Sequence, residues 1–165
     1  MGKMLTRVLS IGVVCGWSAA ASAGPGHQEI DDAGGKRSTA QTTVGNGEMG
    51  TIGGNLTGPR GLPADLEDMY LFRIVDPEIF TARTDVNFGP SGLTNFDTQL
   101  YLFSLGPAAV DAFGLLGNDQ APGAVQGPSF IGNLADDGTA ARIPGPGFYL
   151  LAISGAGRVP VSAGG

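Results

Sequence analysis

Four oxygen-bearing side chains stand at or next to the ends of apolar, strand-like runs, where they could hold a metal ion. They are Asp68, Asp97, Asn118 and Asp119. Calcium takes about six to eight oxygen ligands, many of them carboxylates carried by loops, so these residues predict a calcium site if the fold gathers them at one end. The alternative is that each of them bonds nearby backbone N–H groups, as Asx-turns do. We favour this alternative because calcium needs several anionic oxygens. Calcium is the only cofactor that the sequence suggests.

The histidine and the adjacent acids of this sequence give little support for a catalytic site. His27 is the only histidine. It lies in a polar segment that we expect to be exposed, whereas a Ser-His-Asp triad holds its histidine in a packed site. The adjacent acids Asp136 and Asp137 run into a glycine, which is more typical of a solvated turn than of a glycosidase pair. We therefore predict that the chain is not an enzyme. A small secreted hydrolase that uses carboxylates remains the alternative.

The N-terminus has the features of a signal peptide. Lys3 and Arg7 precede an apolar run over residues 8–21, and a small-x-small motif ends at Ala23, the pattern that a signal peptidase recognises. Cleavage there would remove Cys15, the only cysteine, which excludes thiol catalysis and Cys/His zinc sites. The expected product is secreted to the extracellular space, the periplasm or the cell surface, with no membrane span after cleavage.

Composition argues against nucleic acid as a partner. Removal of residues 1–23 from the 165 leaves 142, with 7 basic and 15 acidic side chains and a net charge of −8. Such a chain offers no basic patch for phosphates, and its length suits one domain with a real core. The 29 glycines and 11 prolines of the full chain separate short apolar runs, as turns do in all-β proteins.

Short strand-like runs follow one another from residue 48 onward. Tyr70, Phe72 and Ile74 alternate onto one face of the run 68–75, which predicts a strand with a core-facing side. Further runs cover residues 51–56, 80–86, 97–103, 129–131 and 148–154, and residues 108–116 fit a hairpin continuation better than a helical turn. We predict an all-β sandwich of about seven short antiparallel strands over residues 48–165, preceded by a flexible lead-in over residues 24–47.

The order of these motifs resembles the bacterial pre-peptidase C-terminal domain, in its stand-alone exported variant. The matching motifs are Asp31-Asp32-Ala33-Gly34, Ile52-Gly53-Gly54-Asn55-Leu56, Asp68-Met69-Tyr70-Leu71-Phe72, Asp97-Thr98-Gln99-Leu100-Tyr101-Leu102-Phe103 with Asn118-Asp119, and Gly147-Phe148-Tyr149-Leu150-Leu151-Ala152-Ile153-Ser154. The resemblance implies a jelly-roll-like sandwich and a non-enzymatic accessory module. Its partner would be an extracellular protein or polysaccharide, and some related modules bind calcium.

Two departures from the family pattern weaken the calcium prediction. Leu66 and Gln120 stand where relatives often carry acids, so two candidate anionic ligands are missing. The family also has a further strand after the late one, which would begin where this chain ends. A truncated chain and a sandwich that lacks this edge strand are the two expectations that follow.

Overall fold

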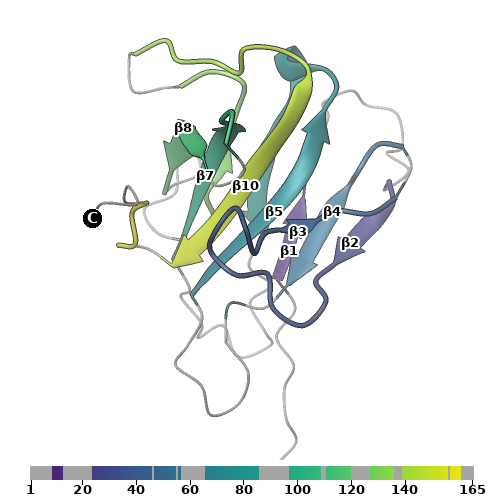
Figure 1. The fold of residues 1–165 in the computed structure, drawn as a ribbon. Helices are drawn as coiled ribbons and strands as arrows, with labels where there is room; N and C mark the ends of the chain where they lie inside the picture. The colour runs from purple at the N-terminus through teal and green to yellow at the C-terminus, as the bar shows by residue number, and fades with distance from the viewer. Residues whose placement is uncertain are drawn as a thin grey trace, which may run out of the picture.

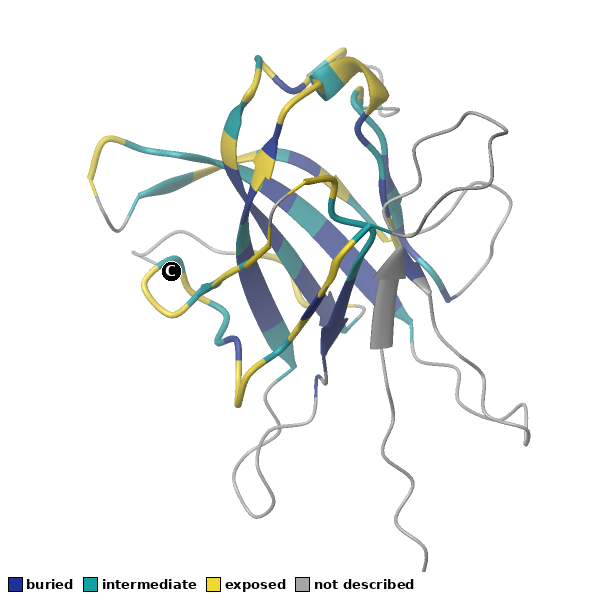
Figure 2. Ribbon diagram, turned by 90° about the vertical axis from the view of Figure 1, so that its right-hand side faces the viewer, coloured by how far each residue is buried: buried dark blue, intermediate teal, exposed yellow. Residues whose placement is uncertain are grey.

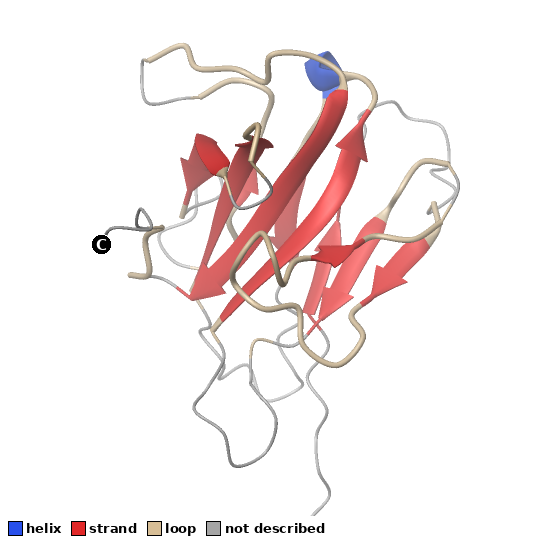
Figure 3. Cartoon of the chain, viewed as in Figure 1, coloured by secondary structure: helices blue, strands red, loops and turns tan. Residues whose placement is uncertain are grey.

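Two β-sheets contain nearly all of the regular secondary structure in this computed structural model (Figures 1 and 3). It describes residues 9–12, 24–45, 47–54, 56, 66–85, 97–108, 111–119, 127–135, 139–155 and 157–160. These residues form ten strands in two five-stranded sheets, with one three-residue 3-10 helix. The predicted all-β sandwich is confirmed. Among the described residues there is no helix with the length and apolar character to cross a membrane.

The first sheet, called sheet A, has the strand order β2-β4-β1-β6-β9. Its strands are β1 (Leu9–Gly12), β2 (Gly26–Gln28), β4 (Thr51–Gly54), β6 (Ala82–Asp85) and β9 (Phe130–Ile131). Three of the four pairings are antiparallel, whereas β2 runs parallel to β4. The 3-10 helix η1 (Pro77–Ile79) precedes β6 and starts where the Asp76 side chain accepts a hydrogen bond from the Glu78 N–H.

The second sheet, called sheet B, has the strand order β3-β5-β10-β7-β8. Its strands are β3 (Gln41–Thr42), β5 (Glu67–Ile74), β7 (Thr98–Leu105), β8 (Ala112–Asn118) and β10 (Gly147–Gly155). The last strand, β10, lies between β5 and β7 and is antiparallel to both (Figure 1). β7 and β8 form the hairpin that the sequence favoured over residues 108–116.

The core lies between the two sheets and is built by alternation along their strands. Tyr70, Phe72 and Ile74 of β5 all point into it, as the sequence predicted, and β10 contributes alternate residues in the same way. Figure 2 shows the long strands as mostly buried, with residues of intermediate burial between the buried ones. Sheet A supplies the facing residues Ile52, Ala82 and Ile131. Each fully buried large aliphatic side chain contributes about 1.5–3 kcal/mol through its removal from water.

The lead-in differs from the exposed segment that we expected. It supplies β2 to sheet A and β3 to sheet B, and both join by parallel pairing, whereas the sequence predicted antiparallel strands only. Together with β1, these short strands raise the number above the predicted seven or so. They are missed because two- and three-residue strands are too short for a periodicity to be seen.

The lead-in also covers the outer face of sheet B. Met69 and Leu150 point away from the core but are buried. The Met69 N–H donates to the Ala33 carbonyl at 2.9 Å. Further on, the Arg37 guanidinium donates to three carbonyl oxygens of the turn between β7 and β8, those of Gly106, Ala108 and Asp111. The lead-in therefore connects β5 to the turn of the β7–β8 hairpin.

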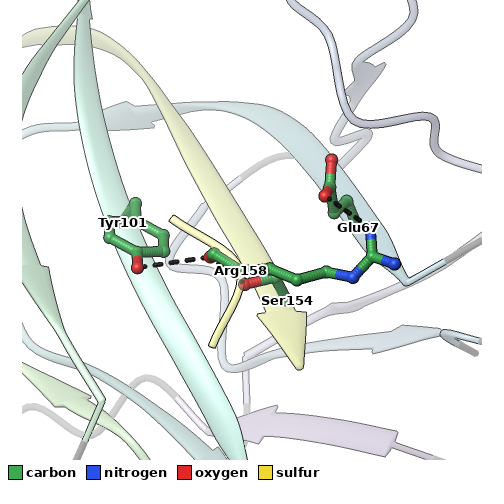
Figure 4. Close-up of polar contacts among 4 residues, drawn as sticks. All are labelled: Glu67, Tyr101, Ser154 and Arg158. Carbon is green, nitrogen blue, oxygen red and sulfur yellow. Dashed lines mark hydrogen bonds and ion pairs between the residues drawn. The ribbon is translucent and has the colours of Figure 1, made fainter. Parts of the chain in front are cut away.

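The chain after β10 is held against the same sheet (Figure 4). Arg158 donates from its guanidinium to Glu67 at 3.2 Å, and its backbone carbonyl accepts from the hydroxyls of Ser154 and Tyr101 at 3.2 and 3.4 Å. Because the Arg158 and Glu67 side chains are about half exposed, the ion pair itself contributes little, on the order of 0–1 kcal/mol.

Candidate functional site

The four predicted ligands are not gathered into one site. Asp68, Ile153, Leu100 and Asn118 are successive partners in one row across β5, β10, β7 and β8. Neighbouring strands are about 4.8 Å apart, so three steps separate the backbones of Asp68 and Asn118 by roughly 14 Å. A single calcium ion, with ligand distances of about 2.4 Å, cannot bridge that span.

Asp97 bonds a backbone N–H that is distant in the sequence, whereas the alternative interpretation expected an Asx-turn to a neighbouring one. Its Oδ1 accepts a hydrogen bond from the Gly127 N–H at 3.0 Å, which holds the segment before β9 against the start of β7. Asp119 is exposed just after β8, and its charge, after burial, is a cause that raises the pKa of the Tyr101 phenol. Asp97 therefore has a role in holding a loop, and Asp119 affects the ionisation of Tyr101.

Asp68 instead joins two acids of the lead-in. Glu29, Asp32 and Asp68 each offer a carboxylate oxygen, and these three oxygens lie within 4.8 Å of one another. We call these three residues the acidic cluster. Glu29 is held there because β2 pairs with β4 immediately before it, and its own N–H donates to the Gly53 carbonyl at 2.8 Å. Its Oε1 also accepts from the Ala33 N–H at 2.9 Å, which folds the lead-in around the cluster.

The acidic cluster lies where β4 ends, at Gly54, and where β5 begins, next to Asp68. Asp68 is almost fully buried, at 1% exposure, while Glu29 is half-buried and Asp32 is exposed. Gly54 of β4 leaves the room that the cluster occupies: a Cβ there would lie 2.7 Å from Glu29 Oε2 and 2.6 Å from the Tyr70 hydroxyl. A glycine at this position therefore lets two side-chain oxygen atoms approach the backbone of β4 closely.

The charges of the cluster act on the neighbouring Tyr70 side chain. Burial and then the charges of Asp68, Glu29 and Asp32 raise the pKa of the Tyr70 phenol far above its usual range. The Tyr70 hydroxyl donates to Asp68 Oδ2 at 3.4 Å. Three carboxylates at this separation repel one another unless a proton or a cation compensates their charge. An all-oxygen, anionic set of this kind suits hard cations such as calcium or magnesium, not zinc or copper.

Sequence reasoning found one member of the cluster and missed two. Asp32 was noticed only as part of a lead-in motif, and Glu29 was not singled out. The signal that could have found them is the short distance between Glu29, Asp31 and Asp32 in an otherwise small and uncharged segment. What the sequence does not reveal is the parallel pairing of β2 with β4, which brings this segment beside Asp68.

His27 is buried, contrary to the exposed position that we expected. It lies in β2 with 3% exposure, and its ring meets that of Tyr70 edge to face, with 6.0 Å between centroids. Neither ring nitrogen has a hydrogen-bond partner within the described part of the chain. The pair of acids considered for hydrolysis, Asp136 and Asp137, lies outside the described residues.

A groove of about 410 Å³ lies on the opposite side of the sandwich, between β8 and β9. Both strands are the last in their sheets on that side. Apolar side chains such as Leu115, Phe130 and Leu134 line it. Its polar groups include the Asn133 side-chain amide, which donates to the Glu78 backbone carbonyl at 3.1 Å and to Glu78 Oε2 at 3.4 Å. The groove and the acidic cluster share no residue.

Comparison of the chain with protein-family models, curated proteins and solved structures gives no match. The acidic cluster and the two-sheet fold are therefore interpreted from their own geometry.

Proposed function

We propose that this chain is a secreted, non-enzymatic β-sandwich binding module of the pre-peptidase C-terminal type. In this proposal it takes up a divalent cation, preferably calcium, at the acidic cluster, and it engages an extracellular protein or polysaccharide. The observation that carries the cation is the meeting of three carboxylate oxygens within 4.8 Å. The close packing of Glu29 against Gly54 supports it, because a side chain at Gly54 would displace this carboxylate from the cluster.

The cation would fasten the lead-in to the sandwich. Glu29 and Asp32 come from the lead-in and Asp68 from β5, so one ion bound to all three joins segments far apart in the sequence. Backbone carbonyls and water would supply the rest of the roughly six to eight oxygens. Such an ion binds only the folded state, and each increase in its concentration therefore stabilises the fold.

The proposal is tested by titrating the purified full chain with calcium in a calorimeter and by thermal unfolding with calcium or with a chelator. At free calcium about 100-fold above Kd, the stabilisation should reach about 2.7 kcal/mol. Asp32→Asn is the first variant to examine, because Asp32 is exposed and its loss leaves the core intact. It should weaken calcium binding at least tenfold.

Glu48→Gln is the matched control, since Glu48 is an exposed acid outside the cluster. It removes the same charge and should leave calcium binding unchanged. Equal weakening by both variants would show a diffuse effect of net charge and no site. The absence of any binding heat, with equal melting temperatures in calcium and chelator, would remove the cation from the proposal.

The binding role is tested separately, with the calcium-loaded protein immobilised against a panel of glycans, collagens and cell-envelope fractions. Saturable binding to one class supports the module. Retention of none above the level of an unrelated β-sandwich protein would count against it. Turnover of a glycan or ester substrate, lost on Asp97→Ala, would favour the hydrolase alternative.

A further inference from the structure

The N-terminal strand β1 occupies the middle of sheet A. It pairs with β4 from Leu9↔Gly54 to Gly12↔Thr51, and with β6 from Ser10↔Asp85 to Gly12↔Arg83. It is antiparallel to both, so β4 and β6 run parallel to each other with one strand between them. The outer sides of β4 and β6 are already paired, with β2 and β9.

This position conflicts with the processing that the proposed function requires. Cleavage after Ala23 would remove β1 from the chain and leave a gap one strand wide inside sheet A. The backbone groups of β4 and β6 that face the gap would lose their partners, and unpaired polar backbone groups beside a core are costly. The core beneath would also open, because Ile52, Ala82 and Thr84 of these two strands are almost fully buried.

We propose that this gap is a strand-acceptor site, which β1 fills before cleavage and an extended segment of a partner protein fills afterwards. The inference rests on the proposed function, because it requires export and cleavage. Strand addition of this kind takes affinity from main-chain hydrogen bonds and specificity from alternate side chains. The site would thus be the place where the module holds its protein partner.

The geometry of the gap specifies what the partner segment must look like. Four residues, antiparallel to β4 and β6, are needed to make every pairing that β1 makes. The residue at the level of Ile52 and Thr84 faces the core, because both of its neighbours do, and it should be apolar. Proline is excluded, because a central strand needs its N–H groups.

Two other occupants fit less well. The described end of this chain, residues 157–160, is held on sheet B by Ser154, Tyr101 and Glu67, and it contains Pro160. A second copy would lose its own β1 by the same cleavage. A segment from a different protein is therefore the occupant that we infer.

The experiment uses the full chain with a specific protease site inserted within residues 13–23, folded first and nicked afterwards. The probe is a fluorescent peptide with the sequence of residues 7–14. We expect saturable binding to the nicked chain, seen as a rise in anisotropy, and at least tenfold weaker binding to the intact chain. A peptide with Ile11→Asp, at the level of Ile52 and Thr84, should bind at least tenfold more weakly than the parent, whereas Ser10→Thr at the neighbouring position should bind within threefold.

Several outcomes would overturn the inference. In the first, β1 dissociates from the nicked chain, and the chain stays monomeric and binds no peptide. Hydrogen exchange in β4 and β6 also stays slow, which would show that these strands need no new partner. In the second, the nicked chain self-associates and the peptide does not compete with this association. The occupant of the gap would then be a second copy of this chain and not a different protein. N-terminal sequencing of exported protein separates the two proposals: an intact Met1 overturns the gap and leaves the cation site standing. Cleavage without peptide binding contradicts the acceptor site alone.

Discussion

The hydroxyl of Thr84 on β6 lies 2.7 Å from the hydroxyl of Thr98 on β7, so a hydrogen bond joins the two sheets through the core. Both residues are fully buried, as is Ser129, whose N–H donates to Thr84 Oγ1 at 2.7 Å. Thr98 Oγ1 is also within 3.1 Å of the Gly127 carbonyl. Because buried polar groups must be paired to be tolerated, these three residues fix how the sheets meet.

Replacing Thr98 by valine keeps the shape of the side chain and removes its hydroxyl. Thr84 then loses a buried partner, and we expect the free energy of unfolding to fall by about 1–3 kcal/mol. Denaturant titration measures the loss. Thr42→Val is the control, because Thr42 is exposed on β3 and its replacement should change stability by no more than about 0.5 kcal/mol. Equal effects would mean that the buried network does not stabilise the sandwich.

Gly54→Ala should disturb the acidic cluster directly. Its Cβ would approach the Tyr70 hydroxyl to 2.6 Å and Glu29 Oε2 to 2.7 Å, so the neighbours must move, at a cost of about 1–3 kcal/mol. Gly145→Ala is the matched control, since nothing lies within 4 Å of a Cβ there. Calcium affinity should fall for Gly54→Ala and stay constant for Gly145→Ala, and an unchanged affinity in both would show that the cluster does not bind the ion.

Stability should decline at alkaline pH through Tyr70. The pKa of its phenol is raised in the folded state by burial and by the charges of Asp68, Glu29 and Asp32, whereas an unfolded tyrosine has a pKa of about 10. Above that pH the unfolded chain releases the proton and the folded chain keeps it, so the free energy of unfolding falls with rising pH. Below it, this contribution is fully present.

Tyr70→Phe should flatten this alkaline decline, because phenylalanine has no proton to release. Tyr101→Phe should do so less, since Tyr101 is only half-buried, although burial and then Asp119 raise the pKa of its phenol too. Urea unfolding at neutral pH and at several alkaline values, with tyrosinate absorbance recorded in parallel, checks both. If all tyrosines of the wild-type chain ionise near their usual pKa while the chain stays folded, the prediction is contradicted.

Arg37→Ala should loosen the outer covering of sheet B. The guanidinium donates to three carbonyls of the β7–β8 turn, and hydrogen bonds to charged groups each contribute about 1.5–3 kcal/mol. Since Arg37 is partly exposed, we expect a total loss near 1–3 kcal/mol, with faster hydrogen exchange in the turn. Arg73→Ala, at an exposed position of β5, should leave that exchange unchanged. If the β7–β8 turn stays protected from hydrogen exchange in Arg37→Ala, contacts other than those of Arg37 hold the turn.

The long strands could be predicted from the sequence because their side chains alternate. Tyr70, Phe72 and Ile74 on β5, and Tyr149, Leu151 and Ile153 on β10, all proved to be core residues. Such strands carry their own signal, since every second residue must be apolar to meet the opposite sheet.

The candidate site could be predicted only in part, because it depends on pairings with little sequence signal. Asp68 was named, but its partners Glu29 and Asp32 reach it through the parallel pairing of β2 with β4. Asp97, Asn118 and Asp119 are near strand ends, as expected, yet ends on the same side of a sheet can lie several strands apart. Register and strand order, which decide such distances, are set by tertiary packing.

The place of β10 also bears on when the fold can form. It follows β5 and β7 in the sequence and lies between them, so sheet B cannot close until residues 147–155 are available. A ribosome that delivers the chain from its N-terminus therefore releases β5 and β7 before the strand that separates them. Until β10 emerges, these two strands have no shared partner, and the core that the three strands build cannot be completed.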